Sequence, residues 1–491
     1  MHLHDLPPEI LTAILEEAAT LNQRLGPTFT YGMSQTPLPG EKAKLQRYIR
    51  GPIGTDMLRW DAVTPLRQVC RAWHEWALNH ALRDVYIRRW RGSEKWAELP
   101  QRRQRYDFYE LITQLSGLPV YADPFCSLRQ TQSLFATYPS IAEKVRRLCF
   151  HGHYHAETST QIMSILASCT YVTTVSVPWI LLRHGSATDW TRVLKSSDPE
   201  QSLQSLDLQA VCLPGKQVSE PSNALDLRPL HDPSVDFSQL RRLKLFGNTT
   251  FMPVCDSDLL AIARTATGLE EFHLTCLSTV TLEGVFAIVE ASRSTLRVLD
   301  HSPRSNDGFF HPHPGTLPSD QHICDLLTSC PKLRDVSISV PSLCPELFAS
   351  ENVQWQGDCQ IRATGLCTTT TSADGSGGAI RPKGTKQAIS VLKRVLSQAR
   401  ELIAARKRHH VDLYIEIFFA SCIFEPSQSR VHGDFALAEI ASSGLWPREK
   451  SGSSKGPYGS TGLYEKDEGD WDVVSEDDFF AGIDGGLIRL A

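Results

Sequence analysis

The chain has 491 residues, of which 41% are hydrophobic and 21% are charged. This length allows about three domains with sizeable cores, which excludes a small scaffold held together by disulfide bonds. The formal net charge of −5 excludes a strongly basic chain, so we expect no nucleic-acid partner. The most apolar stretch, near residues 415–424, is too short to span a bilayer, and we expect no membrane partner.

Thirteen cysteines are scattered along the chain, and their number is odd. The first residues, MHLHDLPPEIL, contain no basic leader followed by a long apolar run. These observations predict reduced thiols and a cytoplasmic or nuclear location.

Two amphipathic helices are predicted in the first eighty residues. Residues 3–19 open with a proline pair, and their apolar residues follow one helical face. Residues 65–78, PLRQVCRAWHEWAL, repeat apolar residues at steps of three and four and include two tryptophans. Either helix, taken alone, could pack on its own domain or face a partner.

Together the two segments resemble the F-box. An opening Leu6-Pro7-x-Glu9-Ile10-Leu11 and a closing Val69-Cys70-Arg71-x-Trp73 carry the resemblance. The two signatures are 63 positions apart, farther than in the compact motif of the family. Residues 20–58 are rich in turn residues, so we expect them to form a surface loop inserted into the motif.

The resemblance implies a small three-helix module that docks on the Skp adaptor and, through it, on the cullin of a ubiquitin ligase. Residue types alone do not separate adaptor contacts from the core of the module. The residues that carry one of these two roles are Leu6, Pro7, Ile10, Leu11, Ile14, Leu15, Leu66, Val69, Cys70 and Trp73.

Residues 83–105 are strongly basic, but Tyr86, Trp90 and Trp96 are spaced for packing a helix with arginines on its solvated face. We therefore expect a helical connector over residues 81–140 rather than a nucleic-acid patch.

From residue 145 a pattern of three apolar residues recurs, with helix-like segments such as DLLAIARTATG between the copies. The pattern resembles the short strand of a leucine-rich repeat. The triplets are Val145/Leu148/Phe150, Val172/Val175/Val177, Leu203/Leu206/Leu208, Leu240/Leu243/Leu245, Leu269/Phe272/Leu274 and Leu333/Val336/Ile338, with an incomplete one at Leu296/Leu299. The expected fold is therefore α/β, with an N-terminal helical F-box module followed by an irregular leucine-rich-repeat solenoid.

Stacked repeats of this kind place their strands on a concave surface that binds macromolecules. Arg241, Arg242 and Lys244 occupy outward positions there and are candidates for gripping an acidic or phosphorylated target. The alternative is that they are solvated strand residues with no partner.

The remaining boundaries follow from composition. Residues 448–491 include an acidic stretch at 464–480, with eight acidic residues against one lysine, and are expected to be loosely ordered. The predicted segments are 1–80 for the F-box-like module, 81–140 for the connector, 141–364 for the solenoid, 365–385 for a flexible loop, 386–447 for a terminal helix-strand unit or cap, and 448–491 for the tail.

Neither a catalytic constellation nor a cofactor site is predicted. The alternating His151, His153 and His155, and the pair His311 and His313, lack the neighbours of a metal site. We expect a non-catalytic receptor that brings an unknown protein substrate to a ubiquitin ligase. The alternative is an interaction scaffold outside ubiquitination, and an enzyme is the weakest hypothesis because no nucleophile and base can be named.

Overall fold

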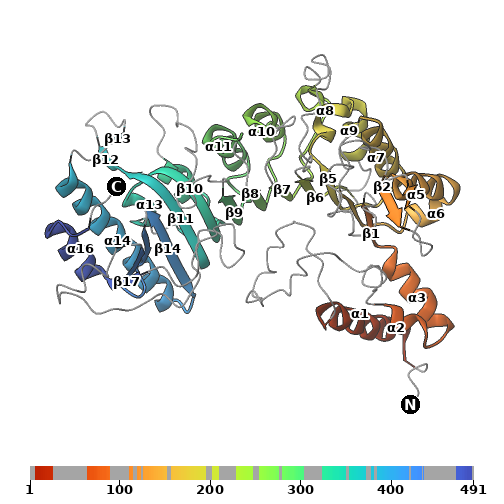
Figure 1. The fold of residues 1–491 in the computed structure, drawn as a ribbon, viewed down its shortest axis with the longest axis horizontal. Coiled ribbons are helices and arrows are strands. Elements are labelled where there is room, and N and C mark those ends of the chain that lie inside the picture. Colours follow the sequence, from red (N-terminus) through yellow and green to blue (C-terminus); the bar gives the residue numbers. More distant parts are fainter. Residues whose placement is uncertain are drawn as a thin grey trace. The chain divides into compact units, whose positions relative to one another are not determined.

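The computed structural model divides the chain into two compact units. The amino-terminal unit comprises Met1–Pro214 and Ser219–Val235, and the carboxyl-terminal unit comprises Gly215–Val218 and Asp236–Ala491. Both combine helices and strands, so the α/β class is confirmed (Figure 1). The structure describes residues 6–25, 63–88, 110–113, 119–122, 125–151, 156–194, 202–209, 228–246, 254–275, 279–302, 323–349, 353–371, 377–380, 384–419, 422–433, 435 and 472–488.

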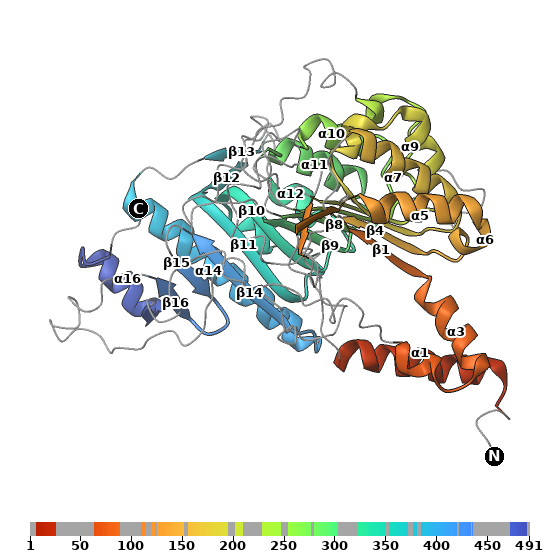
Figure 2. The same ribbon diagram turned by 45° about the vertical axis from the view of Figure 1, so that its right-hand side comes forward.

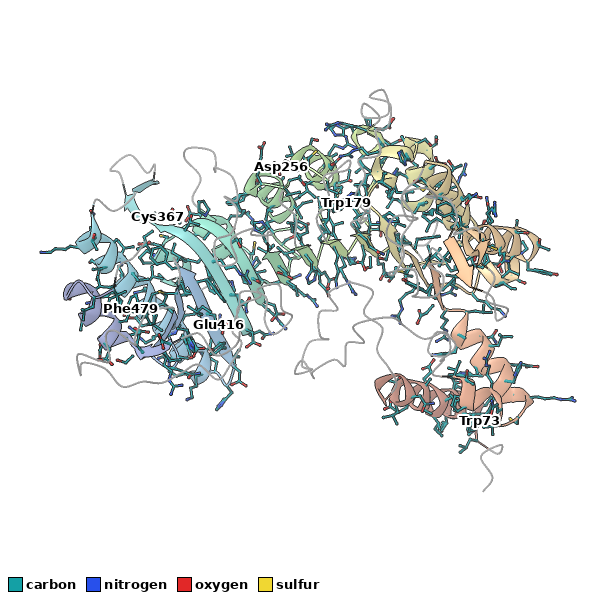
Figure 3. All side chains as sticks on the ribbon, viewed as in Figure 1. Trp73, Trp179, Asp256, Cys367, Glu416 and Phe479 are labelled. Carbon is teal, nitrogen blue, oxygen red and sulfur yellow. The ribbon has the colours of Figure 1, made fainter. Side chains whose placement is uncertain are left out.

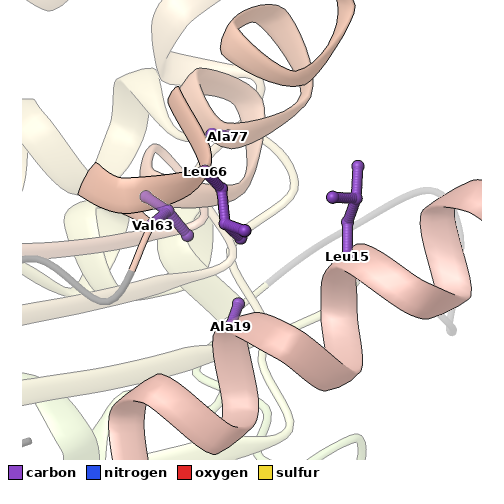
Figure 4. Packing of buried hydrophobic residues seen from close by; sticks show 5 residues of the cluster. All are labelled: Leu15, Ala19, Val63, Leu66 and Ala77. Atoms are coloured by element: carbon purple, nitrogen blue, oxygen red, sulfur yellow. The ribbon is translucent and has the colours of Figure 1, made fainter. Parts of the chain in front are cut away.

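The amino-terminal unit begins with three helices that pack around one small core. They are α1 (Pro8–Leu25), α2 (Thr64–Arg67) and α3 (Arg71–Ala81). Prolines stand at the starts of α1 and α2, where the missing N–H costs no helical hydrogen bond. The core of this helical module consists of Leu15, Ala19, Val63, Leu66 and Ala77 (Figure 4).

The first helix is longer than the sequence predicted. It continues to Leu25, so the expected loop insertion at 20–58 loses its first six residues to α1. The segment LNQRL contains no glycine or proline, and Thr20 donates its hydroxyl to the carbonyl of Glu16. Residues 26–58 of the expected insertion lie outside the described residues.

Four parallel strands follow in the amino-terminal unit: β1 (Asp84–Arg88), β4 (Arg147–His151), β5 (Thr174–Pro178) and β6 (Ser205–Gln209). Figure 1 shows α7 and α9 on one side of β5 and β6. The helices between the strands are α5 (Cys126–Thr137), α6 (Pro139–Ala142), α7 (Ala156–Ser168), α8 (Leu181–His184) and α9 (Ala187–Leu194).

The helical connector expected over residues 81–140 is only partly helical. Its first element is the strand β1, which pairs with β4. The segment Asp84–Arg88 alternates polar and apolar residues and buries Ile87, a period of two that the neighbouring arginines obscured. Later in the connector, β2 (Glu110–Thr113) and β3 (Pro119–Ala122) form an antiparallel pair before α5 begins.

The carboxyl-terminal unit continues the same alternation of strand and helix. Its parallel strands are β7 (Arg242–Phe246), β8 (Glu271–Thr275), β9 (Val298–Ser302), β10 (Asp335–Leu343), β11 (Gly357–Leu366) and β14 (Leu413–Phe419), hydrogen-bonded in that order. The helices between them are α10 (Asp256–Ala263), α11 (Leu282–Ala291), α12 (Ile323–Thr328), α13 (Glu346–Ala349) and α14 (Thr385–Arg408).

All seven predicted apolar patterns coincide with strands, and their apolar residues are buried. Six of these seven strands start with the same hydrogen-bond arrangement, in which two consecutive backbone amides donate to one carbonyl over 2.7–3.1 Å, and that carbonyl belongs to the residue just before the neighbouring strand. The shared arrangement gives these six strands equivalent starts. The accepting carbonyls belong to Arg83, Arg146 and Thr173 in one unit and to Arg241, Glu270 and Arg297 in the other.

Neighbouring helices in the carboxyl-terminal unit are joined by a half-buried cap. The carboxylate of Asp256, at the start of α10, accepts the amide of Thr281 over 2.8 Å and its hydroxyl over 2.8 Å (Figure 3). A Cβ at Gly284 would lie 2.6 Å from the same carboxylate, so only glycine allows α11 this close approach.

The last part of the chain adds three antiparallel strands to the edge of the sheet at β14. They are β15 (Cys422–Glu425), β16 (Arg430–Gly433) and β17 (Asp472–Ser475), followed by α16 (Glu476–Asp484). The helix and strand predicted within 386–447 are present as α14 and β14, and α14 packs on β11 and β14 (Figure 2).

Two expectations of loose structure differ from what is observed. Residues 365–385 contain the antiparallel strands β12 (Thr368–Thr371) and β13 (Gly377–Ile380). In the acidic tail, β17 and α16 are ordered because Phe479 packs edge-on against Phe424 with ring centroids 5.2 Å apart. Among the described residues, no helix is long and apolar enough to cross a membrane.

Candidate interaction surfaces

The helical module separates the ten predicted docking residues into three groups. Leu15 and Leu66 are buried in its core, and Leu11 and Trp73 are half-buried against that core. Leu6 and Cys70 are half-buried, and Cys70 is the extended residue that begins α3. The exposed residues are Pro7, Ile10, Ile14 and Val69.

The exposed members are large and apolar, which marks a surface rather than a core. Ile10, Ile14 and Val69 are 51%, 40% and 57% exposed. Leu21 is also exposed and follows Ile14 by seven positions, so Ile10, Ile14 and Leu21 form one stripe along α1. We call Ile10, Ile14, Leu21 and Val69 the apolar surface of the module. Isolated exposed apolar residues are ordinary, but a stripe on one helix indicates an interaction site.

Sequence reasoning missed part of what builds this module. Val63, Ala19 and Ala77 complete its core, and Trp76 stacks on His80 with ring centroids 4.8 Å apart. An alanine on the apolar face of a predicted helix, such as Ala19 or Ala77, is a usable signal, because a small residue lets two helices approach closely.

Two polar contacts join the helical module to the repeats of the amino-terminal unit. Arg83 lies 3.2 Å from the carboxylate of Glu16, and the ammonium of Lys144 donates to Asn79 over 2.7 Å. These groups are exposed, so each contact contributes little to stability. The stronger link is the backbone, since α3 leads directly into β1.

The second surface is the sheet face opposite the buried apolar residues in the carboxyl-terminal unit. Arg242 and Lys244 alternate there with buried Leu243 and Leu245, whereas Arg241 precedes β7. The guanidinium of Arg242 lies 3.2 Å from the carboxylate of Glu271, and Arg241 and Arg297 lie 3.9 and 3.5 Å from Glu270. The three predicted target-binding residues are therefore not a bare cationic patch, because acidic residues of the next strand neutralise part of their charge.

His273 lies at the centre of this charged face. Its ring is almost fully buried, with Nε2 at 3.5 Å from Glu271 and Nδ1 at 3.7 Å from Asp300. Burial alone lowers the pKa of His273, but the carboxylates of Asp300 and Glu271 together raise it above its ordinary value despite the opposing charge of Lys244. The histidine side chain holds the pKa of the Glu271 carboxyl below its usual range.

Farther along the face, two carboxylates oppose each other. Asp335 and Asp358 stand two residues before Ser337 and Gln360, which are register partners on β10 and β11. Within the described ranges, neither aspartate has an ion-pair partner. Burial raises the pKa of Asp335; the charge of Arg334 lowers it, the carboxylates of Asp358 and Glu271 raise it, and the net pKa is raised.

A buried polar network ties β10, β11 and β14 together. Arg362 is 2% exposed; its guanidinium donates to Ser337 over 2.9 Å and also to the side-chain carbonyl of Gln360, and it lies over the ring of Phe418. The amide of Gln360 in turn donates to Glu416 over 3.0 Å (Figure 3). The network links a buried cation to a buried carboxylate through a neutral amide.

No candidate metal site is found among the described residues. Among the residues that the structure describes, no group of three or more histidine, cysteine or acidic side chains could hold a metal ion. His153, His155, His311 and His313 lie outside those residues.

Comparison with known proteins adds no family to this description. No protein-family model matches the chain, and no curated protein matches it.

Proposed function

We propose that this protein is a non-catalytic substrate receptor of a Skp-cullin-F-box ubiquitin ligase. In this proposal the helical module binds the Skp adaptor, which links the protein to a cullin. The repeats hold an unknown target protein while other subunits transfer ubiquitin. The contribution of the chain is to hold the target in place, and it needs no catalytic residue.

The apolar surface of the helical module is the observation that carries this proposal. The core of the module is filled by Leu15, Leu66 and their neighbours, yet Ile10, Ile14 and Val69 remain 40–57% exposed. Covering a half-exposed isoleucine or valine contributes about 1 kcal/mol. Several such residues together supply the apolar centre of a protein–protein interface.

The order of elements supports the second half of the proposal. Parallel strands alternate with helices, and the same pair of amide hydrogen bonds to one carbonyl starts β4, β5, β6, β8, β9 and β10. We assign this pattern to an irregular leucine-rich-repeat solenoid, in which the strand face binds the target. Since Arg242 pairs with Glu271 and Asp335 stands beside Asp358, the target should present charges of both signs rather than a purely acidic segment.

The test is capture of a purified Skp-family adaptor by the full-length chain. Ile14→Asp and Val69→Asp place a charge on the apolar surface without touching the core. Each should reduce capture about tenfold or more, because a buried unpaired carboxylate costs more than about 1.4 kcal/mol. Leu11→Ala and Trp73→Ala are poorer tests, since both residues pack against the core of the module.

Leu260→Asp is the matched control. Leu260 is a leucine of α10 in the other unit and is 45% exposed, comparable to Ile14. Its substitution should leave capture unchanged. If the folded wild-type chain captures no adaptor, the receptor proposal fails and the interaction scaffold outside ubiquitination becomes the better account of the same repeats.

A further inference from the structure

Ser475 occupies an exposed position in an otherwise buried segment. It follows Val473 and Val474, which are buried in β17, and precedes Glu476, which is buried at the start of α16. Its hydroxyl donates to the carboxylate of Asp478 over 2.7 Å and accepts the Asp478 amide over 3.1 Å. The hydroxyl oxygen is thus at the surface of the carboxyl-terminal unit.

The residues after Ser475 form an acidic run, Glu476-Asp477-Asp478. A serine followed by acidic residues at the next three positions is the pattern that acid-directed protein kinases phosphorylate. Asp477 is exposed and Asp478 is half-buried, so a kinase can contact both residues from solvent. Strand β17 is four residues long and pairs with β16, and Ser475 is its exposed last residue.

Across the strand pair, Ser475 faces a cation. Its register partner on the antiparallel strand β16 is Arg430, and both side chains are exposed. Directly opposite residues of an antiparallel pair have Cβ atoms about 5 Å apart. A guanidinium on that position reaches a phosphate on Ser475 and suits it better than an ammonium, because it can donate two parallel hydrogen bonds.

We propose that Ser475 is a phosphorylation site for an acid-directed serine kinase and that Arg430 holds the resulting phosphate. In the reaction Oγ of Ser475 bonds to the γ-phosphorus of ATP, and the bond from that phosphorus to the bridging oxygen of ADP breaks. ADP leaves, and the hydroxyl proton passes to a carboxylate of the kinase. The hydrogen bond from Ser475 to Asp478 is lost, and the contact with Arg430 replaces it.

The first arm of the test is modification itself. The full chain is incubated with ATP and an acid-directed serine kinase, and phosphopeptides are mapped by mass spectrometry. The wild type should gain one phosphate at Ser475, Ser475→Ala should lose that phosphate, and Asp477→Asn with Asp478→Asn should slow its addition several-fold. A wild-type chain that stays unmodified at Ser475 overturns the proposal.

The second arm asks what holds the phosphate. The second pKa of the phosphoserine is measured by ³¹P nuclear magnetic resonance as a function of pH. In Arg430→Gln it should rise by about half a unit relative to the wild type, because the opposite charge is gone. Arg430→Lys should give an intermediate value, and Arg264→Gln, at an exposed arginine of the same unit, should give the wild-type value. An unchanged pKa in a folded Arg430→Gln chain overturns the role of Arg430.

Discussion

At the scale of single residues, the sheet face carries a charge arrangement that costs stability. Asp335 and Asp358 lie on neighbouring strands and repel each other, and burial raises the pKa of Asp335. The folded chain therefore keeps the Asp335 proton to a higher pH than the unfolded chain does. The resulting loss of stability develops as the pH rises from the unfolded pKa, about 3.9, through the folded pKa, and is complete above the folded pKa.

Asp335→Asn should consequently stabilise the protein at neutral pH. We expect the free energy of unfolding to increase by about 0.5 kcal/mol, the size of one unfavourable cross-strand pair. Denaturant unfolding at pH 7 measures it, with Glu290→Gln on the exposed side of α11 as the control. A less stable Asp335→Asn chain would contradict this prediction and show that attraction to Arg334 outweighs the cost of burial and the repulsion from Asp358.

His273 gives the opposite dependence on pH. Its pKa is raised in the folded state by Asp300 and Glu271, so its contribution to stability is fully present below the unfolded pKa of about 6.5. That contribution is lost as the pH rises through the folded pKa. The groups that face the ring are Glu271 on its own strand, Lys244 and Arg242 on β7, and Asp300 on β9.

The expected result is a melting temperature that falls between pH 6 and pH 8 in the wild type. In His273→Gln the same curve should be flatter, because the titrating ring is gone. Thermal unfolding followed by circular dichroism at several pH values measures both. Equal slopes in the two proteins would contradict the assigned direction of the His273 pKa.

At the scale of elements, α16 is held by an aromatic cluster and one strong ion pair. Phe479 is fully buried against Phe424, Phe435 and Phe480, and the guanidinium of Arg400 on α14 bonds to the carboxylate of Glu476 over 2.5 Å. Although Arg400 lowers the pKa of Glu476, burial outweighs it and the net pKa is raised. The aromatic packing therefore contributes more to docking than the ion pair does.

Phe479→Ala should undock β17 and α16. Removing a buried phenylalanine side chain costs about 3 kcal/mol or more. Hydrogen–deuterium exchange should accelerate over 472–484 and remain unchanged in α10. Leu487→Ala, at a position 45% exposed, is the control and should leave exchange in this segment as in the wild type.

The sequence predicted elements well where apolar spacing was regular. At β4, β6 and β8 the whole apolar triplet is buried, and recognising such a triplet needs no tertiary information. Apolar spacing did not predict strands in which a polar residue is buried against partners on neighbouring strands. Strand β11 includes Gln360 and Arg362, which only the partners Glu416 and Ser337 make compatible with burial.

The candidate surfaces were predicted only as sets of residues. Ile14 and Leu15 are adjacent, both apolar and both on the predicted helix, yet Leu15 is in the core and Ile14 is 40% exposed. The difference depends on where α2 and α3 pack, and the 37 positions between α1 and Val63 hide that from local periodicity. Likewise Arg242 looked like a free cation, because Glu271 reaches it only across the sheet.

At the scale of the whole molecule, the chain combines a small helical module with parallel strands that alternate with helices in both units. The module exposes apolar side chains that its own core does not use, and the sheet face of the carboxyl-terminal unit carries charges of both signs. In the proposed receptor, the apolar surface binds a constant partner and the sheet face binds a selected target. The central claim is that the constant partner is the Skp adaptor and that it binds the apolar surface of the module.

The most direct test is a hydrogen–deuterium exchange footprint of the purified adaptor on the full-length chain. We predict slower exchange over residues 8–21 and 64–81 at saturating adaptor, with no change over 256–263 in α10. In Ile14→Asp the protection over 8–21 should disappear at the same adaptor concentration. A complex whose protection falls outside the helical module, or no protection at any adaptor concentration, would contradict the account.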